Sequence, residues 1–312
     1  MNYQEILDYG FKVLRSSHIK NPKLDSELIL SKILKKNRDQ ILINLKDKLN
    51  NQQIDEFELY LSRRKKKEPM AYILGYKHFW KYKFLINNNV LIPRPETEFI
   101  IEESLKFLPS NKSKNILDIG TGSGCIIISV LKERIKCTAT AIDISKKALK
   151  VAEINAKLHH LANKIKFINI DIDKYTSNKY DLILSNPPYI KNISLNRLDD
   201  DVKFYEPRLA LHGGFDGFSK IEKVIEKSSK LLKNNGKLII EIGDKQKNQS
   251  LELLKRNGFF INKIGKDLSG KDRCLVCSKI DIRKWIILKI IIDAIDLNLM
   301  VIEIIEKEME MV

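Results

Sequence analysis

Apolar residues recur three to four positions apart through the first 75 residues, which is the period of one face of an α-helix. Two such stripes are clear: Ile6, Leu7, Phe11, Val13 and Leu14 form the first, and Ile54, Phe57 and Leu61 the second. Between them, Asn21-Pro22 marks the start of another helix, at Leu24 to Leu34. We therefore expect residues 1–75 to form a small helical domain.

From Glu68-Pro69 onward the helical pattern gives way to short aromatic pieces that are typical of strands. These pieces are Tyr76–Phe79, Tyr82–Ile86 and Val90–Ile92, with Asn87–Asn89 as the turn before the last of them. The pattern predicts a hairpin linker over residues 76–93. A helix at about residues 97–108 is expected to follow.

Apolar runs of five or six residues alternate with helical stretches between residues 115 and 280. The expected strands are Asn115–Ile119, Thr138–Ile142, Ile165–Ile170, Tyr180–Ser185, Lys237–Ile242, Phe259–Ile264 and Cys274–Ser278, and the expected helices are 124–134, 145–160, 217–233 and 246–257. Strands of this kind require a mostly parallel sheet with helices on both faces. The expected fold class is thus α/β, with a Rossmann-like domain over residues 94–280.

The last segment, residues 281–312, is very apolar but is interrupted by Lys289, Asp293, Asp296 and Glu303. This pattern suits an amphipathic helix that packs on something the sequence does not identify. We expect catalysis to be independent of this tail.

Composition narrows the class of protein. The chain is 43% hydrophobic and 31% charged and has no run of 18 uncharged apolar residues, so a membrane-spanning helix is not expected. The N-terminus carries Glu5 and Asp8 and lacks the apolar core of a secretory signal, which favours the cytoplasm. Nor do the four cysteines suggest a disulfide framework or, despite the Cys274–Cys277 spacing, a zinc site. No metal is expected.

The formal net charge is +16. A basic excess is compatible with a polyanionic partner, but here it is spread over the chain, and a general preference for lysine explains it equally well. The densest run, Arg63 to Lys67, falls at an expected helix end, where cations are favourable. A contact with an acidic or RNA-bearing partner is the second interpretation of that run.

Three glycines stand between the first predicted strand of the sheet and the helix that follows it. The segment Gly120-Thr121-Gly122-Ser123-Gly124 has the spacing G-x-G-x-G, whereas a dinucleotide fingerprint would need a glycine in place of Cys125. Glycine is needed where a turn is tight and a ligand approaches the backbone. The segment resembles motif I of class I methyltransferases, which bind S-adenosylmethionine.

Two aspartates follow the next two predicted strands. Asp143 is placed to accept hydrogen bonds from both ribose hydroxyls of a nucleoside, although it could instead cap the helix that begins near Ser145. Asp171 is a candidate for a position near the adenine amine, and a plain loop aspartate is an equal alternative.

A cluster of hydrogen-bond acceptors follows the fourth strand of the predicted sheet. In Asn186-Pro187-Pro188-Tyr189 the two prolines have no N–H, so their carbonyls can only accept, and Asn186 adds a side-chain oxygen. Such a group can hold the two N–H hydrogens of an amine or amide, and Tyr189 would add an aromatic wall. Alignment would then supply most of the catalysis.

Together these segments resemble the N5-glutamine methyltransferases that modify peptide-chain release factors. The resemblance extends over residues 1–278 and includes residues 68–75, 91–98, 205–214, 239–243 and 270–273. It implies a helical substrate-recognition domain, a hairpin linker, a catalytic domain that binds S-adenosylmethionine through Gly120–Gly124, Asp143 and Asn186, and a glutamine held by Asn186–Tyr189. The implied substrate is the glutamine of the Gly-Gly-Gln loop in class 1 release factors. One departure is Ile172, where the family often has an aromatic residue near the adenine.

Two other functions use some of the same features. An enzyme that methylates the amino group of a nucleic-acid base would need the same acceptor cluster, but it would also need a DNA-gripping or target-recognition region for base flipping, and residues 1–75 show none. A cofactor-binding scaffold without activity would be expected to have a damaged acceptor cluster, and this one is intact. We therefore expect a release-factor partner and no membrane or direct DNA contact.

Overall fold

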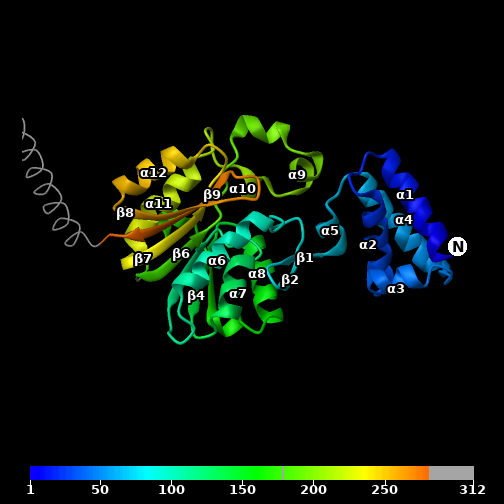
Figure 1. The fold of residues 1–312 in the computed structure, drawn as a ribbon, viewed down its shortest axis with the longest axis horizontal. Coiled ribbons are helices and arrows are strands. Elements are labelled where there is room, and N and C mark those ends of the chain that lie inside the picture. The colour runs from blue at the N-terminus through cyan, green and yellow to red at the C-terminus, as the bar shows by residue number, and fades with distance from the viewer. Residues whose placement is uncertain (178, 281–312) are drawn as a thin grey trace, which may run out of the picture.

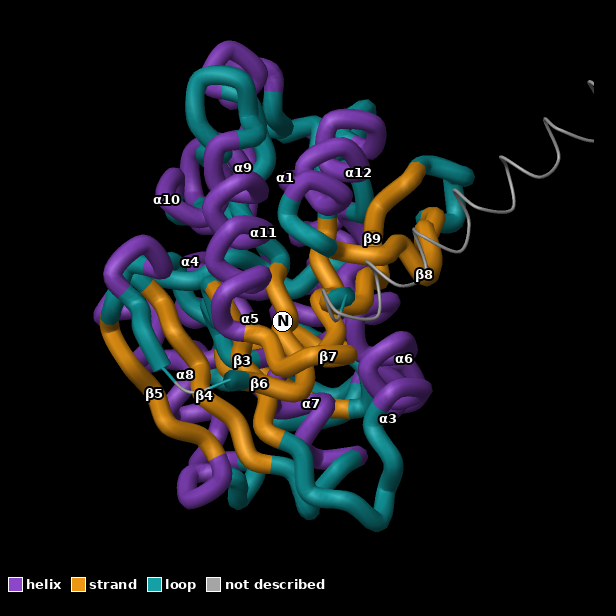
Figure 2. Tube along the Cα trace, turned by 90° about the vertical axis from the view of Figure 1, so that its left-hand side faces the viewer, coloured by secondary structure: helices purple, strands orange, loops and turns teal. Residues whose placement is uncertain are grey.

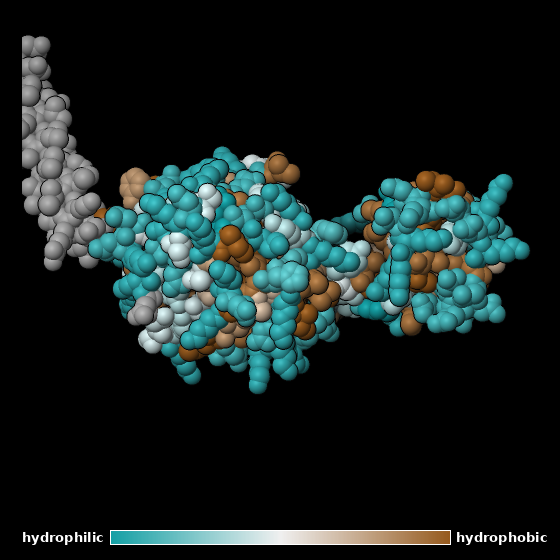
Figure 3. All heavy atoms as spheres, turned by 90° about the horizontal axis from the view of Figure 1, so that it is seen from below, coloured by the Kyte–Doolittle hydropathy of each residue, from teal (hydrophilic) through white to brown (hydrophobic). Residues whose placement is uncertain are grey.

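The computed structural model describes residues 1–177 and 179–280. The tail predicted over residues 281–312 lies outside the described residues. Figure 1 shows a group of short helices, at one end of the molecule, connected by a hairpin to a larger part built around a sheet. In the space-filling view the helical group is a separate lobe, joined to the larger part by a narrow connection (Figure 3).

The helical lobe comprises five helices. They are α1 (Tyr3–Ser16), α2 (Pro22–Leu34), α3 (Arg38–Ile43), α4 (Asn51–Lys65) and α5 (Met70–Leu74). Asn2 and Asn50 cap α1 and α4 through capping boxes, in which each asparagine accepts from the backbone N–H three residues later. The predicted stripes meet in one core that includes Ile6, Leu14, Phe57 and Leu61.

The predicted basic run lies at the end of α4, and part of it is paired within the protein. Arg63 binds Glu68, and Arg64 binds Asp25. Lys67 reaches Asp200, a residue of the larger part of the molecule. These three pairings leave less free positive charge than the sequence alone suggests.

The hairpin is formed by β1 (Tyr76–Phe79) and β2 (Tyr82–Leu85), which pair antiparallel as predicted. The prediction of a further strand-like piece at Val90–Ile92 was wrong, because these residues belong to no strand. Val90 and Ile92 are instead buried in the core, and the Ile92 N–H bonds to the carboxylate of Glu206. A short 3-10 helix, η1 (Pro95–Thr97), then leads into α6 (Glu98–Phe107).

The main sheet has seven strands in the order β5-β4-β3-β6-β7-β9-β8, with β9 antiparallel to both of its neighbours. The strands are β3 (Asn115–Ile119), β4 (Thr138–Asp143), β5 (Ile165–Asn169), β6 (Tyr180–Ser185), β7 (Leu232–Glu241), β8 (Phe259–Lys266) and β9 (Asp272–Lys279). The helices between them are α7 (Cys125–Glu133), α8 (Lys146–Leu158), α11 (Ser219–Leu231) and α12 (Lys247–Arg256). The predicted Rossmann-like α/β fold with a helical N-terminal domain is confirmed.

Helices cover both faces of this sheet, as Figure 2 shows. Alternate residues of each strand supply the two cores, because successive side chains of a strand point to opposite faces. Ile116 packs in the core under α6, α7 and α8, whereas Leu117 packs in the core under α11 and α12. Cys274 likewise lies in the first of these cores and Cys277 in the second. Both are buried free thiols, as predicted.

One segment has no counterpart among the predicted elements. Between β6 and α11 the chain forms three short helices, which are η4 (Asn192–Arg197), α9 (Asp200–Tyr205) and α10 (Arg208–Leu211). This segment reaches the helical lobe, where the Tyr205 hydroxyl donates to the Lys66 carbonyl at 2.7 Å. Within the part of the chain that the structure describes, no helix is both long and apolar enough to cross a bilayer.

Candidate functional site

A pocket opens at the carboxyl ends of β3, β4 and β6, where open α/β sheets bind their ligands. It encloses about 1290 Å³ of space free of protein atoms, solvent at its mouth included. Three groups of residues line it: the loops after the strands, the segment from Asn89 to Thr97, and residues 207–224 of the inserted segment and α11. The pocket is therefore built mainly by loops that the sheet brings together.

The glycine turn forms one wall of this pocket. Gly120 and Gly122 have φ angles of +72° and +57°, in the left-handed region that favours glycine, and a Cβ added to either would meet no atom within 4 Å. Such side chains would extend into the open pocket. The turn thus leaves a backbone cradle that fits a ligand in close contact, which is what a nucleoside cofactor requires here.

Gly124 differs from its two neighbours and does not line the pocket. A Cβ at this position would lie 2.9 Å from Ile128 Cδ1 and 3.2 Å from Ala152 Cβ. The absence of a side chain at Gly124 therefore lets the start of α7 pack closely against α8.

Thr121 and Ser123, the other two residues of the turn, line the pocket and are hydrogen-bonded to residues of the sheet and of α8. The Thr121 hydroxyl donates to the carboxylate of Asp118 on β3 at 2.6 Å, and the Ser123 carbonyl accepts from the Asn155 amide at 2.9 Å. Burial raises the pKa of Asp118 to about 7. The turn is therefore attached to the sheet on one side and to α8 on the other.

Asp143 ends β4 and lines the pocket. One carboxylate oxygen accepts from the Gly122 N–H at 2.9 Å and the other accepts from the Ser145 N–H at 2.8 Å. The side chain that caps α8 is Ser145 itself, which accepts from the Ala148 N–H. Burial raises the pKa of Asp143. Each carboxylate oxygen retains a further acceptor position, so Asp143 can still bind hydroxyls of a ligand.

Beyond β5, Asp171 and Ile172 line the far side of the pocket. The Asp171 carboxylate accepts from the Asp173 N–H at 3.0 Å and so begins the 3-10 helix η3 (Ile172–Lys174). Ile144 and Ile170 lie on the same wall. Three isoleucines, Ile144, Ile170 and Ile172, therefore make this part of the pocket wall apolar.

Asn186, Pro187 and Pro188 line the same pocket as the glycine turn, but Tyr189 does not. The Tyr189 side chain is packed against the core under α11 and α12, and its hydroxyl donates to Glu241 at 3.1 Å. Burial, followed by the charge of Glu241, raises its pKa. Tyr189 thus supports the cluster from behind and forms no aromatic wall in the pocket.

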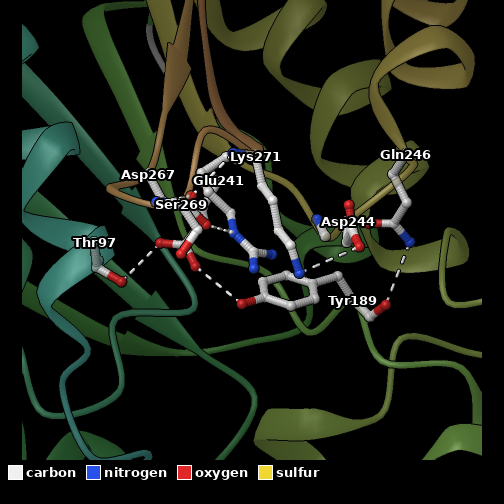
Figure 4. Close-up of polar contacts among 10 residues, drawn as sticks. Thr97, Tyr189, Glu241, Asp244, Gln246, Asp267, Ser269 and Lys271 are labelled. Carbon is white, nitrogen blue, oxygen red and sulfur yellow. Dashed lines mark hydrogen bonds and ion pairs between the residues drawn. The ribbon is translucent and has the colours of Figure 1, made fainter.

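A chain of hydrogen bonds leads from Asn186 to Thr97 and on to Glu241. Thr97 accepts a hydrogen bond from the Asn186 amide at 3.0 Å, and its own hydroxyl donates to Glu241 at 2.7 Å. Figure 4 shows Thr97 and Tyr189 reaching the two carboxylate oxygens of Glu241. Burial raises the pKa of Glu241 to about 7. The only sequence signal for these residues was that they fall in segments of the family resemblance.

The chain matches two family models. One, described as "PrmC N-terminal domain", matches residues 5–75, and the other, described as "Methyltransferase domain", matches residues 110–288.

Curated relatives fall into two groups. A "Bifunctional methyltransferase" of Rickettsia bellii is 36% identical over 308 residues, which is 90% of this chain but 55% of the relative. The chain thus spans little more than half of such relatives. A "Release factor glutamine methyltransferase" of Coxiella burnetii is 38% identical and covers 83% of this chain and 93% of the relative. A protein of the same description from Caulobacter vibrioides is 36% identical, with 84% and 91% covered.

Proposed function

Because the chain belongs to the release factor glutamine methyltransferase family, we propose that it methylates the glutamine of the Gly-Gly-Gln motif in class 1 peptide-chain release factors. The methyl group would come from S-adenosylmethionine and go to the side-chain amide nitrogen, N5. The observation that carries the proposal is one pocket in which the glycine cradle and the acceptor cluster Asn186–Pro188 face the same space.

The cofactor would lie along the wall that runs from the glycine turn to Ile172. Gly120 and Gly122 allow close approach of its amino-acid portion, Asp143 accepts from its ribose hydroxyls, and Asp171 and Ile172 lie beside the adenine. When bound, S-adenosylmethionine supplies a methyl group that is electrophilic because it is attached to a sulfonium.

The acceptor cluster orients the glutamine side chain. An amide nitrogen is a weak nucleophile because its lone pair is delocalised into the carbonyl. The Asn186 side-chain oxygen and the Pro187 carbonyl can accept its two N–H hydrogens and so turn the nitrogen toward the methyl position. Such orientation accounts for a large part of the barrier in proximity-driven reactions. No general base is needed if the proton leaves after transfer.

In this proposal the parts of the chain divide the work. The helical domain, residues 1–75, grips the release factor away from the reaction centre, the hairpin linker at residues 76–93 sets its distance, and residues 94–280 carry out transfer. The substrate acts in translation, so the proposal places the enzyme in the cytoplasm. The chain spans little more than half the length of the bifunctional relative, and the activity proposed here is the one that this pocket would carry out.

The test is incubation of the protein with labelled S-adenosylmethionine and a purified class 1 release factor, followed by mass spectrometry of the Gly-Gly-Gln peptide. We expect a gain of one methyl group, ~14 Da, on that glutamine. A release factor with alanine in place of the glutamine is the matched control. If the label appeared in tRNA, rRNA or DNA and not on the glutamine, the substrate would be a nucleic acid and the proposed protein substrate would be wrong.

A further inference from the structure

We propose that Glu241 and Thr97 are positioning residues that fix which way the side-chain amide of Asn186 faces in the pocket. The inference rests on the proposed function, since it concerns how the acceptor cluster is aimed at the substrate amide. Glu241 does not line the pocket. Thr97 does line it, but its side chain is buried and its hydroxyl is bonded to Asn186 and Glu241.

The direction of the hydrogen bonds follows from the chemistry of the three groups. Burial raises the pKa of Glu241 to about 7, so its carboxyl is mostly ionised above pH 7, the range in which activity is to be compared. An ionised carboxylate can only accept, so Thr97, whose hydroxyl has one proton, donates that proton to Glu241 at 2.7 Å. The hydroxyl oxygen is then left as an acceptor toward Asn186, and the Asn186 NH2 group donates to it at 3.0 Å. With the NH2 group turned to Thr97, the amide oxygen of Asn186 faces the other way, as an acceptor.

Orientation matters because the two ends of an asparagine amide have nearly the same shape and opposite hydrogen-bonding character. With its oxygen in the pocket, Asn186 accepts an N–H of the substrate amide. With the amide flipped, it would present its own N–H groups and repel that substrate. The carboxylate of Glu241 selects between the two states through Thr97.

The second carboxylate oxygen of Glu241 binds Tyr189, the residue at the other end of the segment Asn186–Tyr189. The Tyr189 hydroxyl donates to the remaining oxygen of Glu241 at 3.1 Å. Asn186 and Tyr189 are three residues apart, with two prolines between them that stiffen the backbone. One carboxylate thus anchors both ends of the acceptor cluster, as Figure 4 shows for the Tyr189 and Thr97 arms.

Glu241 and Thr97 are both buried, which restricts their side chains, and burial of the Glu241 carboxylate lowers the stability of the folded protein. Glu241 is 2% exposed and Thr97 is 3% exposed, and Glu241 ends β7, a central strand of the sheet. The charge of Arg273 acts on Glu241, yet the Arg273 Nε donates to Asp267. No ion pair in residues 1–177 and 179–280 includes Glu241. A buried carboxylate without an ion-pair partner lowers stability. Its position here is therefore explained by orientation of the site better than by stability.

The test compares Thr97→Val, which keeps the shape but lacks the hydroxyl, with Thr97→Ser, which restores it. We expect Thr97→Val and Glu241→Gln to lower kcat for release-factor methylation by about 100-fold, the scale of loss for a misplaced reacting group. Thr97→Ser should recover most of the wild-type rate. The affinity for S-adenosylmethionine, measured by calorimetry, should stay within about twofold in all three, since none of the changes alters the cofactor wall.

Glu103→Gln is the matched control. Glu103 is also a buried carboxylate, but it lies on α6, away from the pocket, and is held by Lys106 and Lys263. If Thr97→Val and Glu241→Gln lose no more activity than Glu103→Gln, or if Thr97→Ser is as slow as Thr97→Val, the positioning role is wrong.

A spectroscopic readout separates this inference from the proposed substrate. In 15N-labelled full-length protein the side-chain NH2 signals of Asn186 can be assigned by their absence in Asn186→Ala. We expect Thr97→Val to shift them and to speed their exchange with water. Unchanged signals would overturn the positioning role even if the release factor is methylated. A changed signal in an enzyme that leaves the release factor unmodified would support the role and refute the proposed substrate.

Discussion

The guanidinium of Arg94 lies 2.5 Å from the carboxylate of Glu206, 112 residues further along the chain. Glu206 is buried, with 1% of its side chain exposed, and its second oxygen accepts from the Ile92 N–H. The pair joins the segment that follows the hairpin to the inserted segment between β6 and α11. Arg94 lines the pocket, as does Pro207, which follows Glu206 in the chain, so this ion pair joins two segments of the pocket lining.

Replacement of Arg94 by methionine should destabilise the protein. It leaves the Glu206 carboxylate buried without a cation, and breaking a buried pair in this way costs ~3–5 kcal/mol. A third of the Arg94 side chain is exposed, and burial already raises the pKa of Glu206, so we expect a loss of about 2–3 kcal/mol in the free energy of unfolding. Urea denaturation measures this quantity.

The double variant R94M/E206Q is expected to recover part of that loss, because the unpaired charge is then gone. Lys20→Ala breaks the exposed Lys20–Asp199 pair and serves as the comparison, with little expected effect. If Arg94→Met were no more harmful than Lys20→Ala, the buried pair would have no role in stability.

The variant Asn186→Ala should separate cofactor binding from transfer. Loss of the side-chain amide removes one of the two acceptors for the substrate N–H groups, so we expect methyl transfer to fall about 100-fold or more. Asp143 and the glycine turn remain, and affinity for S-adenosylmethionine should be largely retained. Radiolabel incorporation and calorimetry measure the two effects, and full activity in the variant would refute the acceptor cluster.

Two alanine substitutions in the glycine turn should fail in different ways. Both Gly122 and Gly124 have positive φ, so each change to alanine carries a backbone cost of about 1–2 kcal/mol. At Gly124 the new Cβ also overlaps Ile128 and Ala152, which adds about 1–3 kcal/mol of overpacking. At Gly122 it enters the pocket.

We therefore expect Gly124→Ala to show the larger loss of thermal stability and Gly122→Ala the larger loss of affinity for S-adenosylmethionine. Melting curves and calorimetry on the same two preparations decide between these outcomes. Equal behaviour of the two variants would mean that only the backbone conformation matters.

The Glu241 carboxyl should make stability depend on pH in a predictable direction. Burial raises its pKa from 4.5 to about 7, so the folded protein keeps a proton that the unfolded chain releases between these two values. Stability contributed by this group therefore falls as pH rises from about 4.5 to about 7 and changes little above that. Asp118 contributes in the same sense, because burial also raises its pKa to about 7.

The comparison with Glu241→Gln isolates this group, since Asp118 is present in both proteins. The free energy of unfolding of the variant minus that of the wild type should rise by about 3 kcal/mol between pH 4.5 and pH 7. Any hydrogen bond lost in the variant shifts this difference by a constant and leaves its slope. A difference that is flat across this range would show that Glu241 titrates normally in the folded protein.

Most elements of the sheet were predictable because their patterns are local. The bounds of β3 and β6 agree with those predicted from sequence, and the helices between residues 124 and 257 agree to within one or two residues at each end. The inserted segment was missed because η4, α9 and α10 are too short to show a helical period. Val90–Ile92 was misassigned because buried apolar residues outside a strand have the same local pattern as those inside one.

The sequence by itself determined the two sides of the pocket. The glycine turn, Asp143 and Asn186–Pro188 each follow a predicted strand, and the carboxyl ends of neighbouring parallel strands converge at one edge of a sheet. What lies behind these residues was decided only by tertiary structure. Glu241 meets Thr97 across 144 residues, and such a contact leaves no local period or spacing in the chain. The same holds for Gly124: its neighbour on α8 shows that this glycine serves packing, while Gly120 and Gly122 line the pocket.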